Sequence, residues 1–208
     1  MTQIISSKTG ISDDERRRQI FDGVIFNLPQ SDSVLAFTEL AWELISAAFE
    51  GHDPHTAHEE LSVEEYVAVL SRLKTGFTHH PRSKELLCEV LAEMGCDLTK
   101  TYFDLPKMRI IAPSGYLNTG LGYNYKPQRD PWYALPHCLV NYWAPVSNVN
   151  EDNCMGFYPK YWSRAMPNTS TPSGTPPFSY RATISEGSCS RVSARRKSRR
   201  VVPVALES

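Results

Sequence analysis

The chain has 208 residues, of which 41% are hydrophobic and 22% charged, a composition typical of soluble globular proteins that excludes wholesale disorder. Its longest apolar runs are far shorter than the ~20 residues that a membrane-spanning helix requires, so we expect no membrane association. The five cysteines are odd in number and form no Cys-x-x-Cys pair, which favours reduced thiols and a cytoplasmic location.

Charge and composition divide the chain into parts. Residues 1–163 carry 14 Lys and Arg against 21 Asp and Glu, whereas residues 164–208 carry 8 against 2, so the net charges are −7 and +6. The stretch 168–190 consists largely of Ser, Thr, Pro and Gly and holds too little apolar surface to order itself. We predict a flexible amino terminus over 1–16, a folded domain over 17–166 and a disordered tail over 167–208. The basic run 195–200 lacks interleaved aromatic residues, so nucleic acid is not an expected partner.

The spacing of apolar residues predicts three helices in the first half of the chain. The first runs from Asp32 to Glu50, where apolar residues recur every three or four positions around a wide face. The second begins at Ser62, because Ser62 and Glu65 have the spacing of a capping box, and continues toward Lys74. The third runs from Ser83 to Met94 and ends before Gly95.

After Gly95 the pattern changes to short runs of β-branched and aromatic residues that Pro and Gly interrupt. Met108–Ala112 and His137–Val146 are predicted strands. Helices followed by short strands predict an α+β fold, with helices packed on one face of a sheet.

The most distinctive motifs lie between residues 101 and 162. They are Arg129–Tyr133, Asn141–Pro145, Glu151–Asn153 and Tyr158–Trp162. With these motifs the chain resembles a bacterial and fungal group of phytanoyl-CoA dioxygenase-like proteins, within the iron(II)/2-oxoglutarate-dependent oxygenases. The resemblance runs from about Arg17 to Asn168. It implies a partial double-stranded β-helix, or jelly roll, on which the amino-terminal helices pack.

The resemblance also implies a metal site in which two imidazoles and one carboxylate bind iron(II) and leave positions for 2-oxoglutarate and O₂. Asp130 matches the carboxylate ligand, whereas Gln128 occupies the position of the first histidine and offers only a neutral amide oxygen. His137 is a further candidate ligand. The candidate residues of a substrate pocket are Trp132, Tyr133, Asn141 and Trp143.

The matching sequence ends near Asn168, and no histidine follows His137, so the distal metal histidine and the 2-oxoglutarate arginine of the family have no counterpart here. We interpret the change to a low-complexity tail as the mark of a truncated or frame-altered product. A jelly roll that ends early exposes sheet edges, which a partner chain would cover.

Two functions are compatible with these observations. The first is a dioxygenase that uses Fe(II) and 2-oxoglutarate to oxidise a small organic molecule, in secondary metabolism as in many relatives of the superfamily. The alternative is a catalytically inactive remnant, or a binding or interaction module of the same fold, that needs no cofactor.

Overall fold

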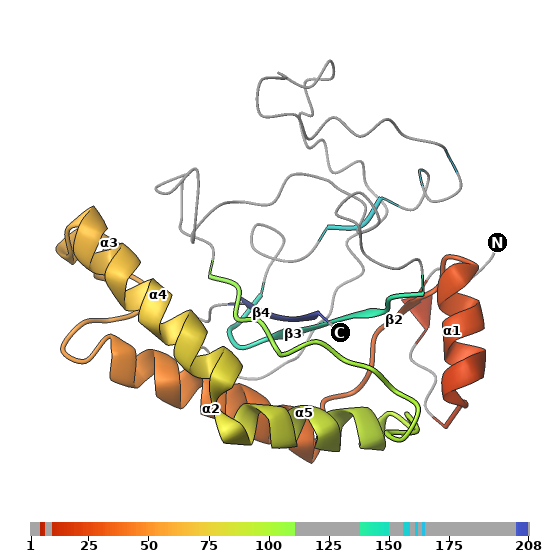
Figure 1. The fold of residues 1–208 in the computed structure, drawn as a ribbon. Helices are drawn as coiled ribbons and strands as arrows, with labels where there is room; N and C mark the ends of the chain where they lie inside the picture. The colour runs from red at the N-terminus through yellow and green to blue at the C-terminus, as the bar shows by residue number, and fades with distance from the viewer. Residues whose placement is uncertain are drawn as a thin grey trace.

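The structure is a computed structural model that describes residues 10–110, 138–149, 156–158, 161 and 164, together with the backbone of two short segments, 5–6 and 203–207. It combines helices with short strands (Figure 1). The helices are α1 (Asp13–Phe21), α2 (Asp32–Ala48), α3 (Ala57–Glu60), α4 (Val63–His79) and α5 (Pro81–Glu93). The strands are β1 (Ile5–Ser6), β2 (Ile25–Phe26), β3 (Asn141–Pro145) and β4 (Pro203–Glu207).

Helices α2, α4 and α5 form a layer on one side of β3 (Figure 1). Their apolar stripes face one another and make the core of the described residues. Phe37 of α2 and Phe77 of α4 are fully buried and meet edge to face, with ring centroids 5.5 Å apart. Leu86 and Leu91 of α5 belong to the same buried cluster. The helical layer that the apolar spacing predicts is therefore confirmed.

The ends of these helices follow the capping residues. Ser31 caps α2, and Ser62 and Glu65 form both hydrogen bonds of the predicted capping box at the start of α4. Helix α4 reaches His79, five residues beyond the predicted end at Lys74, because the apolar stripe continues through Phe77. Helix α5 begins at Pro81 rather than Ser83, since proline is well suited to the first position of a helix.

Helix α1 and the strand pair β1–β2 are features that the sequence analysis did not predict. The strands pair in parallel, Ile5 with Ile25 and Ser6 with Phe26. The α1 sequence is mostly charged and has almost no amphipathic pattern. Its clearest signal is Ser12, whose side chain caps the helix by accepting a hydrogen bond from the backbone N–H of Glu15.

The predicted strands are only partly present. The strand expected over His137–Val146 is the shorter β3, and the prediction of a strand at Met108–Ala112 is wrong for 108–110, which form none. Burial does alternate over 106–110, and Met108 and Ile110 belong to the core, but only residue 107 forms a β-bridge. An alternating pattern assigns the buried face of a segment and does not by itself extend a bridge into a strand. Residues 111–112 lie outside the described residues.

Strand β4 lies within the predicted tail. Its backbone pairs antiparallel with β3, from Asn141 opposite Glu207 to Pro145 opposite Pro203. The remainder of 167–208 lies outside the described residues, so the domain boundaries stay a prediction. No helix in the described part of the chain combines the length and the apolar character that crossing a membrane requires.

Candidate functional site

Strand β3 carries the two candidate site residues that the structure describes, and its two faces differ. Tyr142 and Ala144 pack against the helical core, and Ala144 is only 8% exposed. Asn141 and Trp143 alternate with them, so their side chains point to the opposite face of the strand. Asn141 is exposed and Trp143 is partly buried. We call the side with Tyr142 and Ala144 the helix face and the side with Asn141 and Trp143 the outer face.

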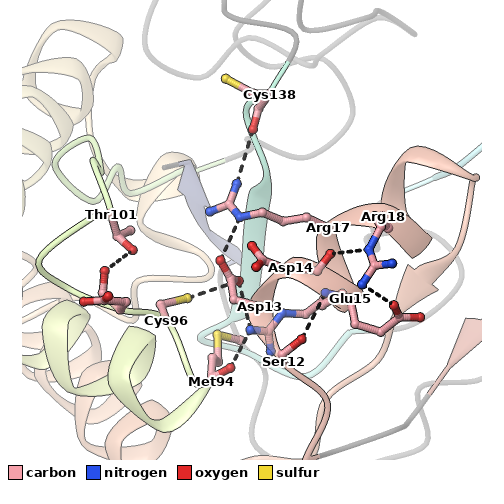
Figure 2. A network of polar contacts seen from close by, with 12 residues as sticks. Ser12, Asp13, Asp14, Glu15, Arg17, Arg18, Met94, Cys96, Thr101 and Cys138 are labelled. Atoms are coloured by element: carbon pink, nitrogen blue, oxygen red, sulfur yellow. Dashed lines mark hydrogen bonds and ion pairs between the residues drawn. The ribbon is translucent and has the colours of Figure 1, made fainter.

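A cluster of polar side chains holds the helix face in place. This α1 cluster consists of Asp13, Arg16, Arg17, Cys96 and Tyr142. The carboxylate of Asp13 pairs with Arg16 at 3.0 Å and with Arg17 at 2.8 Å. The Cys96 thiol donates to the same carboxylate over 3.5 Å (Figure 2). Together with the two arginines, one acid therefore binds three donors.

Two backbone carbonyls extend the α1 cluster to other elements. The Arg16 guanidinium donates to the Met94 carbonyl just after α5, and Arg17 donates over 3.4 Å to the Cys138 carbonyl ahead of β3. Figure 2 shows the Arg17 guanidinium between the Asp13 carboxylate and that carbonyl. The chain turns at position 95, where a φ of +80° favours glycine, and this turn precedes Cys96. The cluster therefore connects α1 with the end of α5 and the start of β3.

The protonation states of the α1 cluster suit a structural role. Burial raises the pKa of the Asp13 carboxyl, but hydrogen bonds from Arg17 and Arg16 outweigh burial, so this pKa lies below its ordinary value. Burial and the Asp13 charge raise the pKa of the Cys96 thiol. Burial also raises the pKa of Tyr142 to about 12. At neutral pH the thiol and the phenol are both protonated, so neither is an activated nucleophile.

The other predicted site residues are not placed by the structure. Gln128, Asp130 and His137, the candidate metal ligands, lie outside the described residues, as do Trp132 and Tyr133. The two candidates that the structure does bring together share the outer face of β3. Within the part of the chain that the structure describes, no three His, Cys, Asp or Glu side chains are grouped to bind a metal ion.

Sequence reasoning missed the α1 cluster. Asp13 and Cys96 are 83 positions apart, and only the fold brings them together. A local signal for α1 did exist, because Ser12 and Glu15 have the spacing of a capping box at the start of a helix. Three arginines follow directly after Glu15.

Comparison of the chain with known protein families, with curated proteins and with solved structures finds no match. The resemblance to the oxygenase group therefore stays a prediction from the motifs between residues 101 and 162.

Proposed function

We propose that the chain binds a small organic molecule at the outer face of β3, on a partial jelly roll related to the iron(II)/2-oxoglutarate-dependent oxygenases. One observation carries this proposal: the helical layer contacts Tyr142 and Ala144, which leaves Asn141 and Trp143 on the other face. The indole of Trp143 offers a flat apolar surface, and the amide of Asn141 offers both a hydrogen-bond donor and an acceptor. This combination is common in small-molecule sites.

The residues that the resemblance assigns to iron do not fit a resident metal. An iron site of this kind needs two imidazoles and a carboxylate. Asp130 supplies the carboxylate, but Gln128 supplies a neutral amide oxygen, which is a weaker donor than imidazole. Of the two functions considered above, this donor set supports the binding module, which binds a small molecule without turnover.

Oxidation of the bound molecule is the second candidate. Asp130 favours it, because the Arg129–Tyr133 motif that contains this carboxylate is retained. Iron would supply O₂ activation with 2-oxoglutarate as the cosubstrate. His137 or a partner chain would then have to contribute the missing imidazoles.

The binding proposal is tested by ligand-detected NMR with a fragment set of small aromatic and aliphatic organic molecules that includes 2-oxoglutarate. Trp143→Ala is the test variant, and Trp42→Ala is the matched control, since Trp42 lies in α2 and stacks on His55. We expect fragments to bind the wild type and the control but not Trp143→Ala. Absence of binding to the wild type, or equal binding to all three proteins, contradicts the proposal.

The oxidation candidate is tested by succinate release from 2-oxoglutarate, with and without iron. We expect none from the wild type and none from Gln128→His, because one histidine does not complete the ligand set. Iron-dependent succinate formation by either protein would establish oxidation instead.

A further inference from the structure

A basic pocket lies at the carboxyl end of α4, made by residues other than those of the outer face. It has a volume of about 430 Å³. Its described lining consists of Lys74, Thr75, Thr78, His79, Lys107, Met108 and Arg109. Three of these seven residues are Lys or Arg, and no Asp or Glu belongs to this described lining.

Two local patterns bring the basic side chains together. Along 107–110 burial alternates, with Met108 and Ile110 buried in the core, so Lys107 and Arg109 lie on the opposite side of the segment. On α4, position 74 is four residues before Thr78, and residues at this spacing share one face of a helix. Thr78 also joins the two segments, because its hydroxyl donates to the backbone carbonyl of residue 106 over 3.1 Å.

The pocket brings positive charges close enough to act on one another. Burial, followed by the positive charge of Arg109, lowers the pKa of Lys74 to about 8. Lys107 pairs with Asp104 at 2.7 Å on the exposed side. The carboxyl end of a helix carries the negative end of its dipole, so attraction for an anion here comes from the side chains and not from the helix.

We propose that this pocket binds the phosphoryl group of a phosphorylated small molecule. A phosphoryl dianion would lie among Lys74, Lys107 and Arg109, and the planar guanidinium can donate two parallel hydrogen bonds to its oxygens. A bound dianion would also offset the repulsion between Lys74 and Arg109. It would therefore favour the protonated form of Lys74.

The test is calorimetric titration of the full chain with inorganic phosphate, with thermal melting at increasing phosphate as the second measurement. Lys74→Gln and Arg109→Gln should each weaken phosphate binding roughly tenfold, the effect of losing a charge-assisted hydrogen bond. Arg72→Gln is the matched control, since Arg72 lies on the same helix but outside this pocket. It should change the affinity by less than about twofold, because Arg72 is exposed and salt screens its charge.

Phosphate should raise the melting temperature of the wild type and of Arg72→Gln, and should have a much smaller effect on Lys74→Gln. Succinate, a dianion of carboxylates, should bind more weakly than phosphate. The proposal is overturned if phosphate does not bind, if the three variants lose affinity equally, or if succinate binds as tightly as phosphate.

Discussion

The two faces of β3 use neighbouring residues for different purposes. On the helix face, Tyr142 and Ala144 have partners in the α1 cluster and in the helical core. On the outer face, Asn141 and Trp143 lie away from that core. The difference teaches that the helix face is committed to holding the fold, so a ligand site on β3 must use the outer face.

The largest effect should come from breaking the α1 cluster. Asp13→Asn removes the charge that pairs with Arg16, which is only 5% exposed, and should lower the free energy of unfolding by about 2–3 kcal/mol. The pKa of Asp13 is below its ordinary value of 3.8, so its contribution is complete above that pH and is lost as the pH falls through the lowered pKa.

Chemical denaturation at pH 7 and at low pH measures both effects. Asp14→Asn is the control, because Asp14 is the next residue of α1 and is exposed; it should change the stability by less than about 0.5 kcal/mol. Equal losses in the two variants would show that the α1 cluster does not stabilise the fold.

The faces of β3 can be compared directly with one new side chain. Ala144→Phe places a ring in the packed core and should cost about 2 kcal/mol of unfolding free energy. Asn141→Phe places the same ring at an exposed position and should change it by less than about 0.5 kcal/mol. Denaturant unfolding of both variants checks this, and a larger loss for Asn141→Phe would reverse the assignment of the faces.

A smaller effect concerns the phenol on the helix face. Because the pKa of Tyr142 is raised from 10 to about 12, its contribution is complete below pH 10 and falls as the pH rises toward 12. Between pH 10 and 12, the free energy of unfolding should therefore fall less in Tyr142→Phe than in the wild type. Thermal melts at pH 9 to 12 provide the comparison, and identical pH profiles would mean that the phenol is not buried in the folded protein.

The helical layer could be predicted well from the sequence because its stabilising contacts follow local periodicity. Phe37 and Phe77 belong to apolar stripes that can be found within each helix, and Ser62 with Glu65 forms a local capping motif. Helix α1 could not be predicted in this way, because its contacts to residues 96 and 138 join distant parts of the chain and leave no apolar pattern.

The candidate sites were less predictable for the same reason. The alternation along β3 places Asn141 and Trp143 together, but only the fold shows which face the helices occupy. Lys74 and Arg109 meet through the packing of 107–110 against α4, and neither belongs to a recognisable motif. The periodicity of a sequence predicts which side chains share a face of a helix or strand. Only tertiary packing determines which other element that face contacts.

The most direct test of the choice between a binding module and an iron-dependent oxygenase is anaerobic calorimetric titration of the full chain with iron(II). Binding without turnover predicts no site of micromolar affinity, because Asp130 and the Gln128 amide give too few strong ligands. A single site of micromolar or tighter affinity that is lost in Asp130→Ala would contradict the account and establish a metal centre.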